Sequence, residues 1–179
     1  MPLAPEILLE RQRQIRLLVL DVDGVLTDGS LFLGDGGEQY KAFNSRDGHG
    51  IRMAQQGGLE VAVLTGRSSA VVTHRMQDLG VRHVLQGRRD KREAMAELLE
   101  RTGFAPETSA YIGDDVVDLP AMRQAAIGIA VADAPPLVLE HADWHTQAPG
   151  GRGAVREVCE ALLAARNRLE DILRAYLEP

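Results

Sequence analysis

Short, almost wholly apolar runs recur along this chain, and they constrain its fold more than any other feature. The first run spans residues 15–20 and ends directly at Asp21. A short aliphatic run of this kind predicts a strand that is buried on both faces, as in a parallel sheet. Segments with helical spacing of apolar residues separate the runs, and this alternation is typical of a doubly wound, Rossmann-like α/β fold. The expected strands are 15–20, 59–64, 83–85, 110–112 and 126–131, and the expected helices are 51–56, 70–79, 92–101, 119–124 and 154–176.

Residues 30–43 break this alternation. Two extended stretches flank the sequence Gly34-Asp35-Gly36-Gly37, and Asp and Gly between extended runs predict a β-hairpin. The length of 179 residues suits one compact unit with a full core. We therefore expect a single domain over residues 1–179, with a hairpin at about 30–43 and a C-terminal helix and tail at about 150–179.

The overall composition excludes several classes of protein. The net charge of −6 and the aromatic content of 4% argue against nucleic-acid binding, which needs a basic surface or stacking platforms. Residues 1–14 lack the apolar stretch of a signal peptide, and no run approaches the roughly 20 apolar residues that span a bilayer. Cys159 is the sole cysteine, which fits a reducing compartment. We expect a cytoplasmic protein that binds neither nucleic acid nor membrane.

Two acids follow the first predicted strand, in the sequence Asp21-Val22-Asp23-Gly24. In open α/β sheets, ligands bind beyond the carboxyl ends of the strands. Two carboxylates this close repel each other unless a cation or a shared proton lies between them. An ordinary Asp/Gly turn would also explain the four residues. The interpretation of Asp21 and Asp23 as part of a site therefore depends on further site residues elsewhere in the chain.

Thr65, Gly66 and Arg67 follow the second predicted strand. A hydroxyl, a glycine amide and the start of the next helix together form a phosphate cradle. The alternative is that Ser68 or Ser69 simply caps that helix.

Asp114, Asp115 and Asp118 follow the fourth predicted strand. Carboxylate oxygens suit Mg²⁺, and they also accept Mn²⁺ and Co²⁺. Helix capping explains one of these acids better than it explains three. Lys91 opens the preceding helix, where its charge opposes the helix dipole, and this position favours a role in a site. The alternative is a solvated surface lysine, which is the default for any single lysine.

The order of these motifs, Asp21-x-Asp23-Gly24, then Thr65-Gly66, then Lys91, then Gly113-Asp114-Asp115, resembles the haloacid dehalogenase superfamily, over about residues 15–163. The stretches 23–29, 41–51 and 150–157 resemble more narrowly its family of 3-deoxy-D-manno-octulosonate 8-phosphate phosphatases, which have no cap domain. The resemblance implies a Mg²⁺-dependent phosphomonoesterase that acts on a small sugar-acid phosphate for lipopolysaccharide biosynthesis.

The resemblance also implies a role for each matching residue. Asp21 is the expected nucleophile, which forms an aspartyl phosphate, and Asp23 is the expected general acid and base. Mg²⁺ is held by Asp21, the backbone carbonyl of Asp23 and Asp114. Thr65 and Lys91 hold the phosphoryl oxygens. Asp115 and Asp118 orient the ligands or the lysine.

Assembly and substrate recognition are further expectations. The segments between the motifs are too short for a separate lid domain, so something else must cover the site. In the resembled family, the hairpin and the tail do so across the subunits of a homotetramer. A sugar acid carries a carboxylate, for which Arg67 and Arg152 are candidates, while Gly66 would bind the phosphate and Asn44 the sugar hydroxyls.

Other functions stay open at this point. The same chemistry could act on a nine-carbon, sialic-type acid 9-phosphate. A phosphomutase would need a lid, and a non-catalytic tetrameric scaffold would be expected to lose Asp21, Asp23 or Lys91. A response-regulator receiver carries its phosphorylated aspartate after a central strand, which does not fit the position of Asp21.

Overall fold

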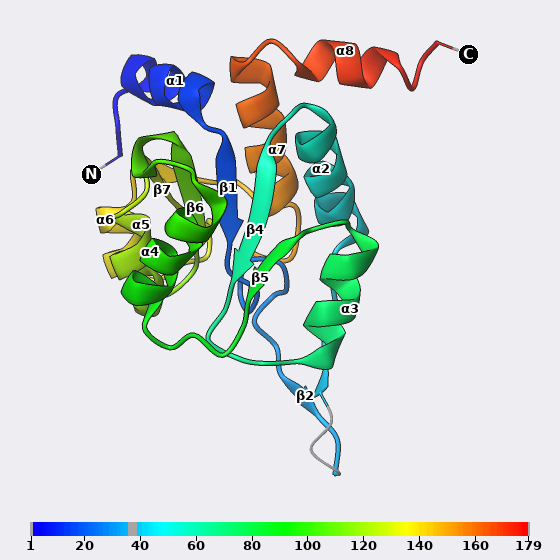
Figure 1. The fold of residues 1–179 in the computed structure, drawn as a ribbon, viewed down its shortest axis with the longest axis vertical. Helices are drawn as coiled ribbons and strands as arrows, with labels where there is room; N and C mark the ends of the chain where they lie inside the picture. The colour runs from blue at the N-terminus through cyan, green and yellow to red at the C-terminus, as the bar shows by residue number, and fades with distance from the viewer. Residues whose placement is uncertain (1, 36–38, 179) are drawn as a thin grey trace.

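A six-stranded, wholly parallel sheet forms the centre of the protein. The computed structural model describes residues 2–35 and 39–178. The strands lie in the order β5-β4-β1-β6-β7-β8, so β1 is central (Figure 1). The strands are β1 (Leu17–Leu20), β4 (Glu60–Leu64), β5 (His83–Leu85), β6 (Ser109–Gly113), β7 (Ile127–Ala130) and β8 (Trp144–His145). All four residues of β1 are fully buried, as the aliphatic run predicted.

Helices cover both faces of this sheet. Figure 1 shows α2, α3 and α7 on one side and α4 and α5 on the other. The helices are α1 (Pro5–Gln14), α2 (Ser45–Gln56), α3 (Ala70–Asp78), α4 (Lys91–Thr102), α5 (Leu119–Met122), α6 (Pro136–His141), α7 (Ala154–Ala165) and α8 (Leu169–Arg174). Two 3₁₀ turns are η1 (Pro106–Thr108) and η2 (Val116–Asp118). The expected doubly wound parallel α/β architecture is confirmed, and no cap domain is present within the described residues.

All five predicted strands are confirmed, with ends that differ by at most two residues. The structure adds β8, which pairs in parallel with β7 at the edge of the sheet. Its two residues are too few to show a periodic pattern. The helices α1 and α6 were also not predicted. Pro136 starts α6, a position that proline favours because an N–H group there would have no partner within the helix.

Two helices differ from the prediction in extent. Helix α2 begins six residues early, at Ser45, and includes Gly48 and Gly50. A Cβ atom on Gly50 would lie 2.9 Å from the Cα atom of Arg156, so the glycine permits α2 to pack closely on α7. The predicted helix 154–176 is wrong as a single element. It breaks after Ala165, where Asn167 adopts a φ of 56°, a conformation that asparagine tolerates better than most residues.

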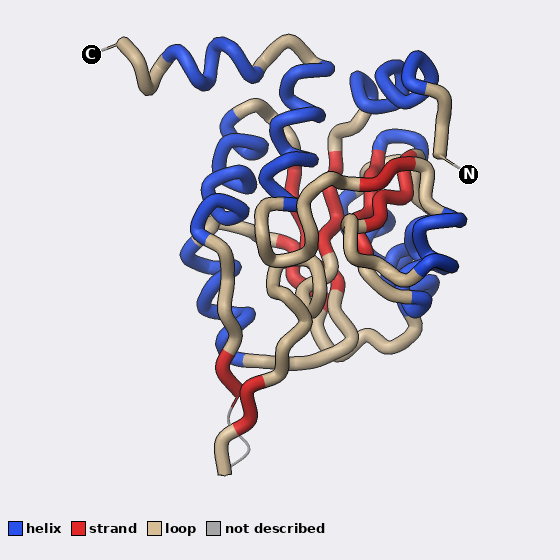
Figure 2. Tube along the Cα trace, turned by 180° about the vertical axis from the view of Figure 1, so that it is seen from behind, coloured by secondary structure: helices blue, strands red, loops and turns tan. Residues whose placement is uncertain are grey.

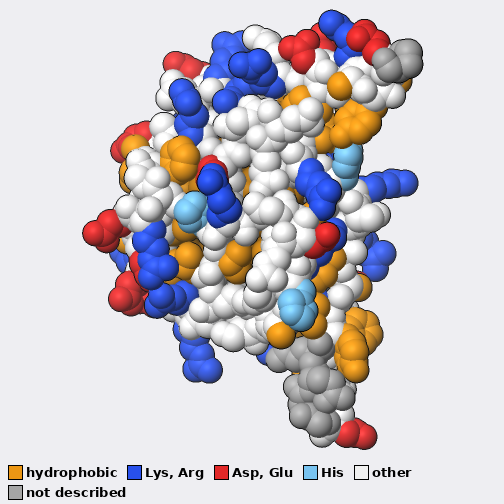
Figure 3. All heavy atoms as spheres, turned by 45° about the vertical axis from the view of Figure 1, so that its right-hand side comes forward, with side chains coloured by type: hydrophobic (Ala, Val, Ile, Leu, Met, Phe, Trp, Pro, Cys, Tyr) orange, Lys and Arg blue, Asp and Glu red, His pale blue; other side chains and the backbone are white. Residues whose placement is uncertain are grey.

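Two short strands, β2 (Phe32–Leu33) and β3 (Gln39–Tyr40), pair antiparallel outside the main sheet. They project beyond the body of the molecule (Figure 2). The turn of the predicted hairpin, at residues 36–38, lies outside the described residues, so the complete hairpin stays a prediction. Phe32, Leu33 and Tyr40 are all exposed, and Figure 3 shows hydrophobic side chains gathered beside this segment. Across residues 2–35 and 39–178, we find no helix with the length and apolar character required to cross a bilayer.

Candidate active site

Three neighbouring strands end level with one another and deliver polar residues to the same edge of the sheet. Leu20 at the end of β1 pairs in register with Val63 of β4 and with Ile112 of β6. Asp21, Thr65 and Asp114 follow these three strands and meet in a pocket of about 490 Å³. The pocket is lined by Asp21, Asp23, Gly29, Thr65, Gly66, Arg67, Arg89, Lys91, Asp114, Asp115 and Val117.

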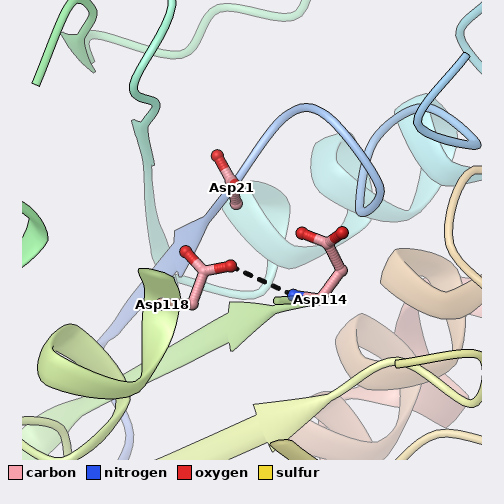
Figure 4. Close-up of side chains that lie close together, drawn as sticks. All are labelled: Asp21, Asp114 and Asp118. Carbon is pink, nitrogen blue, oxygen red and sulfur yellow. Dashed lines mark hydrogen bonds between the residues drawn. The ribbon is translucent and has the colours of Figure 1, made fainter. Parts of the chain in front are cut away.

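Three carboxylates form the most acidic part of this site. Asp21, Asp114 and Asp118 each offer an oxygen, and these oxygens lie within 4.8 Å of one another. Figure 4 shows them converging from the end of β1, the end of β6 and the turn η2. Asp21 retains 6% of its surface and Asp118 none. Three acids this close and this buried need positive charge among them.

Asp118 is the best satisfied of the three acids. Its Oδ1 accepts a hydrogen bond from the hydroxyl of Tyr111 at 2.7 Å, and its Oδ2 accepts the backbone amides of Asp114 and Asp115 at 3.2 and 3.3 Å. These bonds fix the backbone from which the Asp114 side chain projects. The carboxylate of Asp115 accepts the amide of Val116 at 2.7 Å, so Asp115 caps η2 as the capping alternative predicted.

Lys91 supplies positive charge next to the acids. Its Nζ atom lies 2.9 Å from Asp21 Oδ1 and 2.9 Å from Asp118 Oδ1. It also donates to the carbonyl oxygen of Leu64 and to the hydroxyl of Tyr111, both at 3.0 Å. The side chain is 3% exposed. Lys91 is the first residue of α4, whose start is fixed by the Asp90 side chain, which accepts two backbone amides.

The electrostatics of the cluster suit a divalent cation. Burial, and then repulsion from Asp118, raises the pKa of Asp21 to about 7. Burial and the neighbouring carboxylates, chiefly Asp118, raise the pKa of Asp114 to about 8. Burial lowers the pKa of Lys91, but attraction to Asp21 and Asp118 more than offsets this, and the net shift is upward.

Lys91 is a single positive charge beside the three carboxylates of Asp21, Asp114 and Asp118, so part of their negative charge stays uncompensated. Within the described residues, Asp21 Oδ1 is buried, and its close polar neighbour is the Nζ atom of Lys91 at 2.9 Å, which Asp21 shares with Asp118. Buried oxygens of this kind are the ligands that Mg²⁺ prefers. The donor set therefore fits a magnesium ion.

Backbone hydrogen bonds hold the loop after β4 in place. The Thr65 amide donates to Leu85 at 2.9 Å, and the Thr65 carbonyl accepts the amide of Arg88 at 3.0 Å. Ser69 precedes α3 but makes no side-chain cap, since the side chain of Gln86 accepts its amide instead. Gly66 and Arg67 line the pocket, as does Thr65.

Asp23 has two cationic neighbours. Lys41 forms an ion pair with its Oδ1 atom, and Arg67 Nε lies 3.6 Å from its Oδ2 atom. Sequence reasoning missed Lys41 as well as Arg89, another residue that lines the pocket. A signal for Lys41 was available, because the chain contains two lysines among its 20 basic residues and the other is Lys91.

Asn44 and Arg152 do not line the pocket. Asn44 caps α2 by accepting the amide of Arg46 at 2.8 Å, and it donates to the carbonyl oxygen of Gly151 at 3.3 Å. Arg152 lies 3.4 Å from Asp28. Their predicted roles in substrate binding stay predictions, and their contacts within this chain are structural.

Comparisons with known proteins agree with this arrangement. Residues 80–156 match the family described as haloacid dehalogenase-like hydrolase. The chain is 48% identical over 170 residues to the 3-deoxy-D-manno-octulosonate 8-phosphate phosphatase of Salmonella typhimurium, covering 95% of this chain and 90% of that protein.

Solved structures are similar over nearly the whole chain. The 3-deoxy-D-manno-octulosonate 8-phosphate phosphatase of Yersinia pestis has a TM-score of 0.90 and 47% identity, covering 92% of this chain and 89% of that one. The Moraxella catarrhalis phosphatase of the same name, in complex with magnesium ion, phosphate ion and KDO, has a TM-score of 0.92 and 40% identity, covering 96% and 98%. At this identity and coverage, the chain belongs to the 3-deoxy-D-manno-octulosonate 8-phosphate phosphatase family of the haloacid dehalogenase-like hydrolases.

Proposed function

We propose that this protein is a Mg²⁺-dependent phosphatase that hydrolyses 3-deoxy-D-manno-octulosonate 8-phosphate to the free sugar acid and phosphate. The observation that carries the proposal is the convergence of Asp21, Asp114 and Lys91 in one pocket at the carboxyl edge of the sheet. The identity of 48% to a phosphatase with this substrate in its name supports the choice of ester.

Asp21 is the nucleophile in this proposal. One of its oxygens attacks phosphorus, the bond from phosphorus to the sugar oxygen breaks, and an aspartyl phosphate forms. Asp23 donates a proton to the departing sugar oxygen. Asp23 then accepts a proton from the water that attacks the aspartyl phosphate, which releases phosphate and restores Asp21.

Asp21 and Asp114, with the backbone carbonyl of Asp23, would hold the magnesium ion. When bound, the ion neutralises charge on the phosphate and so permits an anionic nucleophile to approach it. The raised pKa values of Asp21 and Asp114 support this assignment, because they indicate a negative cluster that lacks a counter-charge. The Moraxella catarrhalis relative is described in complex with magnesium ion.

The remaining pocket residues bind and orient the substrate. Thr65, Gly66 and Lys91 hold the phosphoryl oxygens, where negative charge is spread in the transition state. Asp118 positions Lys91 and the Asp114 backbone, while Asp115 caps η2 at the rim of the pocket.

Arginines supply recognition of the sugar-acid carboxylate. Arg67 and Arg89 both line the pocket, and guanidinium groups bind carboxylates through paired hydrogen bonds. Arg152 and Asn44 would contribute only if substrate binding or a neighbouring subunit frees them from their contacts with Asp28 and Gly151.

We further propose that residues 1–179 form one catalytic domain and that four such subunits form a cytoplasmic homotetramer. The product of the reaction would enter lipopolysaccharide synthesis. The exposed apolar side chains of β2 and β3 support assembly, because a two-stranded unit is marginal alone and gains by burial against neighbours. Light scattering measures the oligomeric state directly.

Phosphate release from a panel of esters tests the activity. The panel contains the octulosonate 8-phosphate, a nonulosonate 9-phosphate and hexose phosphates, each with Mg²⁺ or EDTA. We expect metal-dependent preference for the octulosonate ester, its loss in Asp21→Asn, and its retention in Asp171→Asn, the same change on the exposed helix α8. Preference for the nine-carbon ester would keep the chemistry and change the substrate. Folded protein that is inactive on every ester would overturn the proposal and favour a scaffold.

A further inference from the structure

The two lysines of this chain are both buried against the acids that follow β1. The other 18 basic residues, from a total of 20, are arginines. Both lysine side chains are almost completely buried, with 2% of Lys41 and 3% of Lys91 exposed. Each contacts one acid of the Asp21-x-Asp23 motif, Lys91 on Asp21 and Lys41 on Asp23. A compact ammonium group with rotatable donors fits such confined places where the planar fork of arginine does not.

Lys41 contacts Asp23 from the side of the projecting strands. It follows Tyr40, the last residue of β3, and its Nζ atom donates to Asp23 Oδ1. Asp23 retains 20% exposure and lines the pocket. Its second oxygen lies 3.6 Å from Arg67, whose side chain is 52% exposed. Of the two cations at Asp23, Lys41 is therefore the fixed one and Arg67 the solvated one.

The buried ammonium group of Lys41 depends on its contact with Asp23. An ammonium group loses its hydration when it is buried, and this cost is offset only by a close partner. Asp23 is the partner that the structure supplies among the residues described. The pairing in turn restricts rotation of the Asp23 side chain, since turning the carboxylate away would leave the ammonium buried alone. With Oδ1 held, Oδ2 is directed to one place.

Proton transfer depends on such restriction. A general acid acts only within hydrogen-bond reach of the departing oxygen, and a displacement of about 1 Å costs about 100-fold in rate. We infer that Lys41 is a positioning residue, which fixes the carboxyl group of Asp23 for protonation of the leaving oxygen and links that step to the placement of β3. This inference rests on the proposed function, in which Asp23 is the general acid.

Leaving groups of different basicity distinguish this role from a merely structural one. A sugar alkoxide needs a proton to depart, whereas p-nitrophenolate departs without one. The parameter kcat/KM reports the steps up to formation of the aspartyl phosphate, so it isolates the protonation of the leaving group from the later attack of water. The experiment measures kcat/KM on the octulosonate 8-phosphate and on p-nitrophenyl phosphate, with saturating Mg²⁺.

We expect Lys41→Met to lose about 10- to 100-fold on the sugar ester and less than about 3-fold on the aryl ester. Asp23→Asn is expected to show the same selectivity with a larger loss on the sugar ester. Arg82→Met is the matched control, because Arg82 pairs with Glu60 away from the pocket and is 75% exposed. Activity on the aryl ester also shows that each variant is folded.

Equal losses of Lys41→Met on both esters, or no loss on either, would overturn the inference and leave the proposed function intact. Absence of the selectivity in Asp23→Asn would also overturn it, because Asp23 would then not be the general acid. Wild-type protein that hydrolyses neither ester would instead refute the proposed function. If Lys41→Met does not unfold cooperatively, Lys41→Gln replaces it and the same outcomes apply.

Discussion

Magnesium binding to this chain is expected to depend steeply on pH, because the ligands must lose protons before they bind the ion. Asp21 and Asp114 have pKa values of about 7 and about 8 in the metal-free protein, chiefly through burial. Both values lie near neutral pH. A change from pH 6 to pH 8 therefore moves Asp21 through most of its titration and Asp114 through about half of its titration.

The size of the effect follows from these two pKa values. Between pH 6 and pH 8 the ionised fraction rises about 10-fold for Asp21 and about 50-fold for Asp114. Mg²⁺ binding that needs both carboxylates is then tighter at pH 8 by a factor on the order of 100 or more. At saturating Mg²⁺, each 100-fold decrease in Kd adds about 2.7 kcal/mol to the free energy of unfolding.

The stability of the metal-free protein is expected to follow the opposite trend and to fall as the pH rises. A carboxyl group whose pKa is raised by folding binds its proton more tightly when folded. Its contribution to stability is complete below the unfolded pKa of 3.8 and is lost as the pH rises through about 7 for Asp21 and about 8 for Asp114. Added Mg²⁺ is expected to offset this loss.

Calorimetric titration of Mg²⁺ and thermal unfolding with and without Mg²⁺, at pH 6, 7 and 8, measure both trends. Asp114→Asn removes one ligand and is expected to weaken binding and flatten its pH dependence, while Asp171→Asn serves as the control. Equal Mg²⁺ affinity at pH 6 and pH 8, in protein that stays folded at both, would contradict the assignment of these acids as ligands.

Three further perturbations test other parts of the site. Asp118→Asn removes the charged acceptor of the Tyr111 hydroxyl and of two backbone amides. We expect a loss of about 1–3 kcal/mol in the free energy of unfolding and at least about 10-fold in kcat, measured by urea unfolding and phosphate release. Gly150→Ala places a Cβ atom 1.7 Å from the carbonyl oxygen of Gly24, so we expect displacement of the nucleophile loop and a fall in kcat of about 10-fold or more; unchanged kcat would show that this contact is unimportant. Leu33→Ser removes an apolar side chain that is 67% exposed, and light scattering is expected to show smaller assemblies without loss of stability in the subunit.

Much of the fold was predictable because its signals are local. Each buried strand is a short aliphatic run, and such runs have few alternatives to the interior of a parallel sheet. Asp21, Thr65 and Asp114 could be assigned to one edge because each directly follows a strand, and parallel strands share their carboxyl edge. The elements that were missed, such as β8, carry too few residues for a periodic pattern.

Contacts between segments that are distant in the sequence were harder to predict. Nothing in the sequence around Lys41 shows that it reaches Asp23 across 18 positions. The helix break at Asn167 did have a signal, since asparagine is common where a helix ends in a left-handed residue. The apolar spacing continued past this residue, because Ile172 also packs on the core, and this continuity favoured one helix.

Asn44 and Arg152, whose predicted role as substrate ligands stays a prediction, also make contacts within this chain. Asn44 donates a hydrogen bond to the carbonyl oxygen of Gly151, and Arg152 pairs with Asp28 in the loop that follows Asp21. Asp47, one turn along α2 from Asn44, is 1% exposed, and its carboxylate accepts the amides of Gly153 and Arg156 at the start of α7.

These contacts tie α2 and the glycine-rich loop at residues 150–153 to the loop that carries Asp21. The Gly151 amide completes the connection by donating to Val25 at 2.8 Å. A nucleophile must be held within fractions of an ångström of its target, and loops achieve this only when other elements support them. In this chain the glycines permit the close approach of the two loops, and Asn44, Asp47 and Arg152 make the polar contacts that hold the loop after Asp21 in place.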